Sequence, residues 1–281
     1  MSHSEEELDA FAHWERQAWE TRAAPYAESI TDLTRGAADA LLDAASVSAA
    51  SRLLDVATGP GVVALAGRER GADVVAVDQA QGMVAIASAA GLDVRQAGAE
   101  HLPFDDAAFD AVVAGFLLNH LARPLQGVVE MTRVCRGRVA VSVWDVPAAN
   151  PALGLFGPVV ESLGLPEVVP PGPEGHRYAD DAHLTQLLAD AGLTDIHIDR
   201  VRWTVTVDAG AWFDAVAAST PRTGSVLAAA MPEERAVLRE RYVETAGAMF
   251  GGPGGLVTLP AAAVVGSGRA AGNSHAALRD L

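Results

Sequence analysis

The chain has 281 residues, half of them hydrophobic, and a formal net charge of −16 at pH 7. Such a negative surplus repels phosphate backbones and anionic lipid headgroups, so we expect neither a nucleic-acid partner nor a membrane partner. The single cysteine, Cys135, excludes an internal disulfide, and together with the lack of a secretory leader it favours a cytoplasmic protein. The chain contains no lysine, which excludes a P-loop lysine, a Schiff-base lysine and the tyrosine–lysine pair of short-chain dehydrogenases.

The first half of the chain predicts a helical cap followed by a nucleotide-binding core. Residues 1–50 are rich in helix formers, with apolar and aromatic side chains at helical spacing. From residue 51 onward, short β-branched runs alternate with helical stretches, and the runs predict strands at 52–56, 74–78, 93–95, 109–114 and 138–144. This alternation is typical of a parallel sheet covered by helices on both faces. We therefore predict a cap over 1–50 and a Rossmann-like core over 51–146.

The second half of the chain does not continue this alternation of strands and helices. A passage rich in proline and glycine at 147–173 is interpreted as a lid, and a helix at 180–191 and a strand at 195–207 follow it. Helices are expected within 209–250, with breaks at Pro221 and Pro232, before an apolar run at 256–265 that we expect to return to the sheet edge. We assign 147–266 to the lid, the remaining strands and a helical substrate-binding insertion, and 267–281 to a flexible tail.

The predicted fold class is therefore α/β. We expect a doubly wound, Rossmann-like, mostly parallel seven-stranded sheet with an N-terminal helical cap and helical insertions.

The strongest local signal is a buried strand that turns through Gly59 and Gly61 into a helix beginning near Ala64. Glycines let the backbone approach a ligand closely, and a helix N-terminus offers free N–H donors to a carboxylate or phosphate. The pattern also satisfies the loose dinucleotide motif, so by itself it indicates only an adenosine-containing ligand.

Two carboxylates at strand ends narrow this choice. Asp55 ends the first strand, where its charge suits an ammonium group and would repel a pyrophosphate. Asp78 ends the second strand, where a carboxylate can accept hydrogen bonds from both ribose hydroxyls, a feature shared with NAD enzymes. The pair favours a nucleotide that carries an amino acid.

The order of these pieces, together with the segments 98–104 and 109–113, resembles the class I S-adenosylmethionine (SAM)-dependent methyltransferases. The bacterial group that includes ubiquinone/menaquinone-type and antibiotic-tailoring enzymes is the most similar, closely over 50–145 and loosely elsewhere. The resemblance implies SAM as the cofactor. The residues that it implies for cofactor binding are Asp55, Ala57, Gly59, Gly61, Asp78, Gln79, Met83, Ala99, Glu100 and Phe116. Ala57 replaces the glycine usual in the family, and we expect a turn that is not left-handed there.

Methyl transfer is an in-line displacement at a carbon activated by a sulfonium, so the protein supplies alignment, exclusion of water and, where needed, a base. His120 is the first candidate base, followed by His176 and Tyr178 in the lid. Aromatic bodies with polar tips suit a flat acceptor, which points to Trp19, Tyr26 and Trp144 as substrate contacts. The other aromatic residues considered for this role are Trp14, Trp203, Trp212 and Phe213.

The predicted function is methyl transfer from SAM to a carbon, oxygen or nitrogen of a small, partly aromatic or apolar molecule, by analogy in natural-product biosynthesis (secondary metabolism). No cluster of carboxylates has the spacing of a magnesium site, so no metal is expected. One alternative is a protein of this fold that uses SAM non-catalytically, as a rearrangement catalyst or binding module. A less favoured one is an NAD-dependent oxidoreductase. The assembly could be a homodimer.

Overall fold

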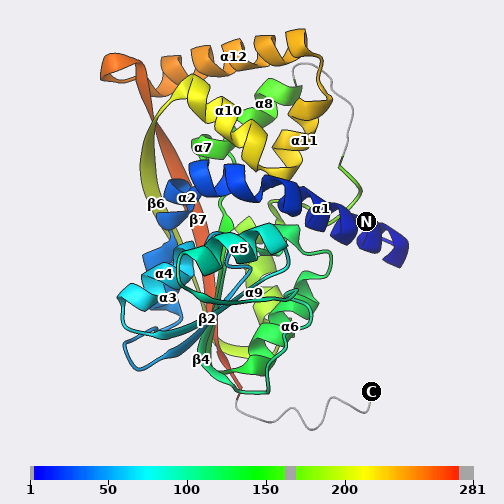
Figure 1. Ribbon diagram of the computed structural model, residues 1–281, viewed down its shortest axis with the longest axis vertical. Coiled ribbons are helices and arrows are strands. Elements are labelled where there is room, and N and C mark those ends of the chain that lie inside the picture. The colour runs from blue at the N-terminus through cyan, green and yellow to red at the C-terminus, as the bar shows by residue number, and fades with distance from the viewer. Residues whose placement is uncertain (1–2, 162–168, 272–281) are drawn as a thin grey trace.

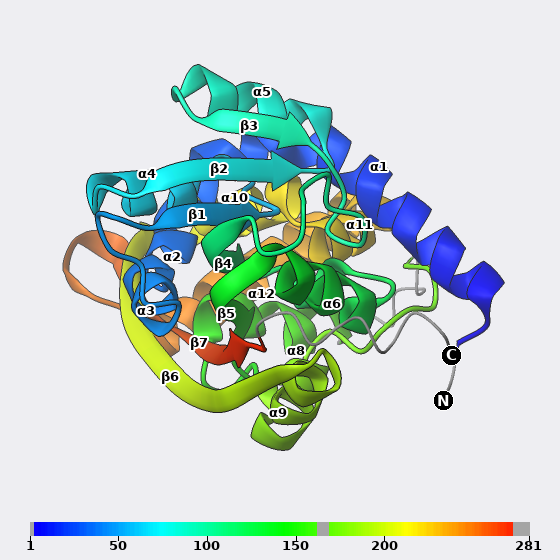
Figure 2. The same ribbon diagram turned by 90° about the horizontal axis from the view of Figure 1, so that it is seen from below.

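The computed structural model describes residues 3–161 and 169–271, and its centre is a seven-stranded sheet in the order β3-β2-β1-β4-β5-β7-β6. The strands are β1 (Arg52–Val56), β2 (Asp73–Asp78), β3 (Asp93–Gln96), β4 (Phe109–Gly115), β5 (Cys135–Trp144), β6 (Leu193–Asp208) and β7 (Leu256–Ala270). Strands β1 to β5 pair in parallel, whereas β7 runs antiparallel to both β5 and β6. The mostly parallel sheet predicted from the sequence is confirmed (Figure 2).

Helices cover both faces of the sheet because successive strand residues point to opposite sides. On one face, Leu54 and Val112 belong to the core formed with α6 (Pro124–Val134) and α9 (Asp181–Asp190). On the other, Leu53 and Val113 pack with α3 (Ala38–Ala44) and α4 (Val62–Glu69). Further along the sheet, α5 (Gln81–Ala89) packs against β2 and β3. The doubly wound arrangement is thus confirmed.

A helical annex stands above the sheet and is joined to it by the long strands β6 and β7 (Figure 1). It contains α7 (Pro151–Gly154), α8 (Phe156–Glu161), α10 (Ala209–Ser219), α11 (Pro221–Ala229) and α12 (Pro232–Phe250). The breaks predicted at Pro221 and Pro232 are present, and each proline begins a new helix because it lacks the N–H that the first helical turn would leave unpaired anyway. Short 3₁₀ turns complete the chain: η1 (Leu118–His120), η2 (Arg177–Ala179) and η3 (Pro253–Gly255).

The segment predicted as an N-terminal cap contains α1 (Glu5–Ser29), α2 (Thr31–Arg35) and α3, of which α3 packs on the sheet. Helix α1 begins at a capping box, in which the Ser4 side chain accepts from the Glu7 N–H and the Glu7 carboxylate accepts from the Ser4 N–H. It crosses the molecule between the sheet and the annex (Figure 1) and packs against α5 on one side and α10 on the other.

Two expectations about the C-terminal part are corrected. The run 256–265 does not return to the sheet edge, because β7 lies between β5 and β6. The strand also continues to Ala270, so residues 267–270 belong to the sheet and Ser267 is buried. Small residues permit this burial: a Cβ at Gly266 would lie 2.8 Å from the Leu184 Cδ2 atom. Residues 272–281 of the expected tail and 162–168 of the expected lid lie outside the described residues, and the rest of the predicted division remains a prediction.

Within 3–161 and 169–271, no helix is both long and apolar enough to cross a bilayer.

Candidate active site

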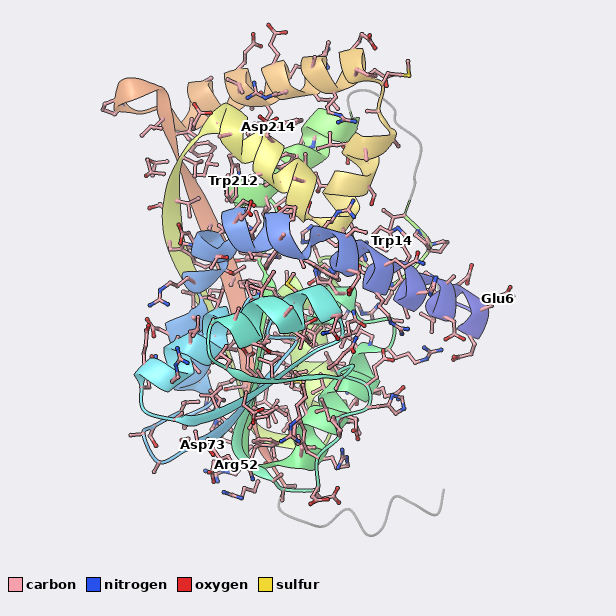
Figure 3. All side chains as sticks on the ribbon, in the orientation of Figure 1. Glu6, Trp14, Arg52, Asp73, Trp212 and Asp214 are labelled. Atoms are coloured by element: carbon pink, nitrogen blue, oxygen red, sulfur yellow. The ribbon has the colours of Figure 1, made fainter. Side chains whose placement is uncertain are left out.

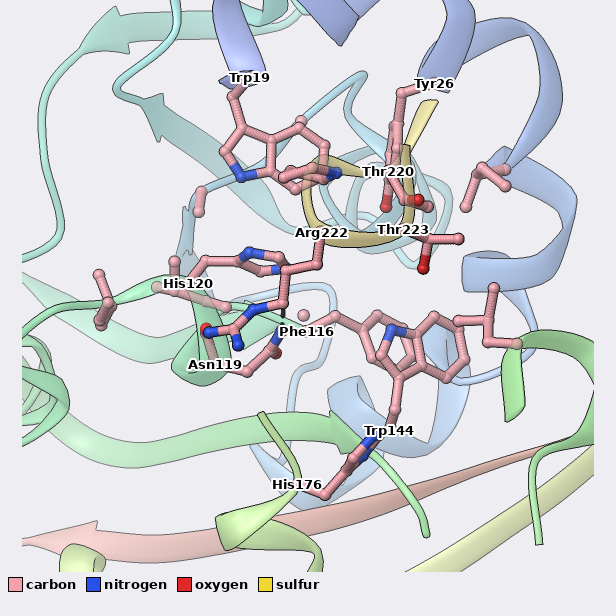
Figure 4. A pocket seen from close by; sticks show the side chains of 18 of the residues that line it. Trp19, Tyr26, Phe116, Asn119, His120, Trp144, His176, Thr220, Arg222 and Thr223 are labelled. Carbon is pink, nitrogen blue, oxygen red and sulfur yellow. Dashed lines mark hydrogen bonds between the residues drawn. The ribbon is translucent and has the colours of Figure 1, made fainter. Parts of the chain in front are cut away.

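A cavity of about 350 Å³ opens at the carboxyl ends of the parallel strands, where the strand order reverses between β1 and β4. Ligands of open α/β sheets bind at such a reversal, and the volume falls within the usual range for small-molecule sites. The residues lining the cavity from the sheet side include Ala57, Gly59, Asp78, Gln79, Met83, Ala99, Gly115, Phe116, His120 and Trp144. Those lining it from the cap and annex include Trp19, Tyr26, Asn150, Leu153, Phe156, Thr220 and Arg222 (Figure 4).

The glycine turn between β1 and α4 has three left-handed residues, with φ of +56° at Ala57, +54° at Gly59 and +96° at Gly61. The expectation that position 57 would not be left-handed is therefore wrong. The reason is the tightness of the turn: the Thr58 N–H donates to Val77 O of the neighbouring strand, and the chain must bend sharply to make that bond. Gly61 lies under α5, where a Cβ would come within 2.5 Å of the Leu92 Cδ1 atom.

Asp78 holds the glycine turn from the side of β2 and lines the cavity. Its Oδ2 accepts from the Gly59 N–H at 2.8 Å, and its Oδ1 accepts from the Ala80 N–H at 2.9 Å. Burial raises the pKa of this carboxyl, and the backbone hydrogen bonds oppose that shift. Each carboxylate oxygen retains a lone pair, so Asp78 can also accept from two hydroxyls of a ligand.

Asp55 is buried beneath the same turn. Its Oδ2 accepts from the Thr58 Oγ1 at 2.7 Å and from the Ala64 N–H at 3.0 Å. Burial raises the pKa of Asp55 to about 7, against the lowering effect of these two hydrogen bonds. Asp55 borders a second cavity of about 50 Å³, which shares Tyr26, Ala57, Gly59, Gly115 and Phe116 with the first.

Aromatic rings form the walls of the main cavity. Phe116 stacks on Trp144, with ring centroids 3.8 Å apart and planes at 17°. Phe116 has a φ of +57°, and its N–H donates to Ser142 O at 2.9 Å. Strained residues of this kind cluster at ligand sites. From α1, the Trp19 ring meets both Tyr26 and His120 edge to face (Figure 4).

Three polar side chains form a hydrogen-bonded chain along one wall. His120 Nδ1 lies 3.0 Å from Glu15 Oε2, and His120 Nε2 lies 3.0 Å from Asn119 Nδ2. Glu15 comes from α1 and is 0% exposed. Because a carboxylate only accepts hydrogen bonds, this arrangement places the imidazole proton on Nδ1 and leaves Nε2 as the acceptor.

Sequence reasoning did not identify Glu15, Asn119 or Arg222. A signal for Glu15 was present, because Phe11, Glu15 and Ala18 follow the spacing of one buried helix face, where a lone carboxylate is unusual. No local pattern pointed to Arg222, whose Nη2 donates to Asn119 O at 3.4 Å and to Pro173 O at 3.2 Å.

The structure brings most of the expected site residues together at the main cavity. Asp55 borders only the smaller one. His176 reaches the main cavity, and its pKa is lowered by partial burial and by the positive charge of Arg222. Gly61 shapes the turn from outside the cavity, and the Glu100 carboxylate faces away, accepting from the Arg123 N–H at 3.0 Å.

Tyr178 lies elsewhere: it packs against the core under α9. Four other aromatic residues suggested for substrate binding also lie outside the cavity lining: Trp14, Trp203, Trp212 and Phe213. The Trp212 and Phe213 rings fill the annex core, and Trp14 lies on the part of α1 farther from the annex (Figure 3). Burial of apolar area within the annex is the physical reason that the Trp212 and Phe213 rings are unavailable.

Residues 54–141 match a family model described as a methyltransferase domain. Several curated demethylmenaquinone methyltransferases are similar. The protein from Beutenbergia cavernae is 33% identical over 149 residues, or 51% of this chain and 62% of the relative. The one from Mycolicibacterium gilvum is 31% identical over 177 residues, or 57% of this chain and 74% of the relative. The match therefore spans less than two thirds of the Beutenbergia relative.

Solved structures share the fold. The YcgJ protein from Bacillus subtilis superimposes with a TM-score of 0.53 at 20% identity, covering 83% of this chain and 97% of that one. The [4+2]-cyclase SpnF superimposes with a TM-score of 0.52 at 21% identity, covering 86% of this chain and 82% of that one. At these identities the likeness concerns the fold alone.

Proposed function

Because the chain belongs to the class I SAM-dependent methyltransferases, whose cofactor is SAM, we propose that it methylates a carbon, oxygen or nitrogen of a small, partly aromatic or apolar molecule. One observation carries the proposal. A single cavity runs from the buried carboxylate of Asp78, next to the glycine turn, to the imidazole of His120. A nucleoside bound at one end would therefore share the cavity with a proton acceptor at the other.

The residues present fit SAM. Asp78 has free lone pairs for both ribose hydroxyls, and Gln79, Met83 and Ala99 line the adjoining part of the cavity, where the adenine would lie. The left-handed turn from Ala57 to Gly61 brings backbone close to the smaller cavity, which suits the methionine end. Asp55 supports this turn through Thr58 and Ala64, and an ammonium group bound nearby would favour the charged form of its carboxyl.

When bound, SAM supplies a methyl carbon made electrophilic by the sulfonium. The protein's part is to orient the acceptor, exclude water and receive a proton. Trp19, Phe116 and Trp144 provide flat walls that would hold a planar acceptor. We propose that His120 takes the acceptor's proton, with His176 as the second candidate, because both side chains line the cavity. Tyr178 is no longer proposed, since it lies outside the cavity lining.

Calorimetric titration with S-adenosylhomocysteine tests the cofactor site. Asp78→Asn should weaken binding about 10- to 100-fold, because hydrogen bonds to a charged group contribute roughly 1.5–3 kcal/mol. Asp73→Asn is the matched control, because Asp73 is the first residue of the same strand and lies exposed at the end of β2 opposite Asp78 (Figure 3). Equal affinities for D78N and the wild type, or no binding to the wild type, would contradict the proposal.

Turnover separates methyl transfer from the alternatives. Incubation with methyl-labelled SAM and a cell extract of small molecules should form S-adenosylhomocysteine and a product heavier by one methyl group. A non-catalytic role for SAM predicts neither, and an oxidoreductase predicts tighter binding of NADH than of S-adenosylhomocysteine.

We place the reaction in natural-product tailoring within the cytoplasm, on the strength of the resemblance to antibiotic-tailoring enzymes. A homodimer is proposed as the assembly, to be checked by light scattering.

A further inference from the structure

The contact between Glu15 and His120 joins residues 105 positions apart in the chain. Glu15 is carried by α1, whereas His120 ends η1, just after β4. Trp19, one helical turn after Glu15, meets the imidazole edge to face, with ring centroids 5.1 Å apart. The helix that covers the cavity thus holds the candidate base on two sides.

We propose that Glu15 is a positioning residue that keeps the His120 proton on Nδ1, so that Nε2 can take the proton of an acceptor whose reacting group is an acidic hydroxyl. This inference rests on the proposed methyl transfer and narrows its acceptor class. The acceptor's O–H bond breaks and its proton goes to Nε2. An electron pair of that oxygen forms the bond to the methyl carbon. The carbon–sulfur bond breaks with its electrons going to sulfur, which gives S-adenosylhomocysteine.

Burial explains why Glu15 can act in this way. A carboxylate shielded from water needs a hydrogen-bond donor, and the contact from His120 Nδ1 to Oε2 provides it. In the part of the chain that the structure describes, the other oxygen, Oε1, has no hydrogen-bond partner. Moving the imidazole proton to Nε2 would leave both carboxylate oxygens unpaired. Glu15 therefore favours the tautomer in which Nε2 is free of a proton.

Asn119 occupies the position that the acceptor would take. Its Nδ2 lies 3.0 Å from His120 Nε2, while its buried Oδ1 has no hydrogen-bond partner among the described residues. A hydroxyl that enters the cavity can replace this amide at Nε2 without leaving the imidazole unpaired. The exchange loses one neutral hydrogen bond and gains another, so its net cost is small.

The basic groups near the pair favour an oxyanion, and the acidic residues that line the same cavity already have partners: Asp145 pairs with Arg200 at 3.4 Å, and Asp78 accepts from two backbone N–H groups. From α11, Arg222 lines the cavity and donates to Asn119 O. Partial burial and the positive charge of Arg222 lower the pKa of His176, which also lines the cavity. From α1, Arg22 interacts electrostatically with Glu15. Positive charge fixed next to the site where negative charge develops stabilises that charge, especially away from water.

A coloured phenol tests the inference. 4-Nitrophenol is the probe, because its phenolate absorbs visible light, and it is titrated against pH with the protein saturated by S-adenosylhomocysteine. We expect the bound phenol to ionise at a pH at least one unit below that of the free phenol, a tenfold increase in its ionisation constant. Glu15→Gln should remove most of this shift, because a glutamine amide can donate to Nδ1 and so allow the proton to lie on Nε2.

Glu20→Gln is the matched control. Glu20 also ties α1 to the core, through an Oε2 that accepts from the Gln81 N–H at 2.8 Å, but it does not contact His120. E20Q should therefore keep the phenol shift, and circular dichroism should show that both variants fold. If Glu15 only held α1 in place, E15Q and E20Q would behave alike, and the inference would be overturned.

Other results also overturn it. One is that 4-nitrophenol does not bind to the protein saturated with S-adenosylhomocysteine. The other is that it binds but ionises at the same pH as the free phenol. The proposed function is judged separately by the binding of S-adenosylhomocysteine. A protein that binds this molecule but does not ionise the phenol would keep its assignment as a methyltransferase and lose only the acidic-hydroxyl acceptor.

Discussion

At the scale of single residues, the site depends on two buried carboxylates with different tasks. Asp78 reaches the cavity and holds the Gly59 N–H, whereas Asp55 is turned into the loop and bonds to Thr58 and Ala64. Burial raises the pKa of both groups, and that of Asp55 reaches about 7. The protein therefore keeps a proton on Asp55 at pH values where the unfolded chain has released it.

Asp55→Asn should change how stability depends on pH. Between about pH 4 and pH 7 the folded wild type binds more protons at position 55 than the unfolded chain, so its free energy of unfolding falls as pH rises. Asparagine removes this titration and still offers an oxygen to Thr58 and Ala64. We expect the free energy of unfolding of D55N to rise relative to that of the wild type across this range, by on the order of 2–4 kcal/mol at pH 7. Denaturant unfolding at several pH values checks this, and parallel curves for the two proteins would contradict it.

Ala57 carries backbone strain in the same turn. An L-residue in the left-handed region costs about 1–2 kcal/mol, and glycine avoids that cost but loses about 0.5–1 kcal/mol of entropy on folding. Ala57→Gly should therefore raise the free energy of unfolding by up to about 1 kcal/mol. Ala66→Gly, in the right-handed interior of α4, should lower it and serves as the control. A loss of stability in A57G, measured by thermal unfolding, would show that the strain is relieved in some other way.

At the scale of elements, α1 is the part that turns a nucleotide-binding sheet into a closed site. It contributes Trp19 and Tyr26 to the cavity wall and Glu15 to His120. It is held at several points, including the contact of Arg22 Nε with Thr220 O at 3.2 Å. It also packs closely on α5, where a Cβ at Gly82 would lie 2.8 Å from the Ala23 Cβ.

Gly82→Val should push α1 away from α5. Overpacking of this kind costs about 1–3 kcal/mol, and the displaced helix should weaken binding of S-adenosylhomocysteine at least about tenfold. The control is Gly247→Val in α12, where, apart from its chain neighbours and the helix's own backbone, no atom of the described residues lies within 4 Å of an added Cβ. Titration calorimetry and thermal unfolding of both variants measure the effect. Unchanged affinity in G82V would mean that α1 is not needed to hold the cofactor.

At the scale of the whole molecule, the cavity lies where three parts meet: the sheet, the cap and the annex. The long strands β6 and β7 belong to the sheet and also carry the annex (Figure 1). Thr220, the N-cap residue of α11, and Arg222 within α11 line the cavity from the annex side. A ligand that fills the cavity would contact all three parts and stabilise them together.

Hydrogen exchange should detect this coupling. A ligand at 100 times its Kd stabilises the folded state by about 2.7 kcal/mol, and the opening of any element that contacts it becomes rarer. With saturating S-adenosylhomocysteine, we expect slower amide exchange in α1 and α11 as well as in the glycine turn. Protection confined to residues 53–83 would show that the cap and annex do not close on the cofactor.

Local patterns predicted most of the sheet and part of the site. The strand expected at 52–56 is β1, and the other predicted strands overlap β2 to β7. These assignments succeed because β-branched runs, glycine turns and strand-end carboxylates act within a few residues of one another. The resemblance drawn from those residues also pointed to the family, and it singled out His120 before its partners were known.

The sequence by itself determined the alternation of strands and helices, the glycine turn and the carboxylate of Asp78, because each depends on neighbours in the chain. Only the tertiary structure decided that β7 lies inside the sheet, that Ala57 is left-handed and that Tyr178 packs away from the cavity. It alone brought Glu15 to His120, since the packing of α1 onto the folded sheet sets that contact across 105 positions. Such contacts follow from how buried faces fit together, which no short window of sequence contains.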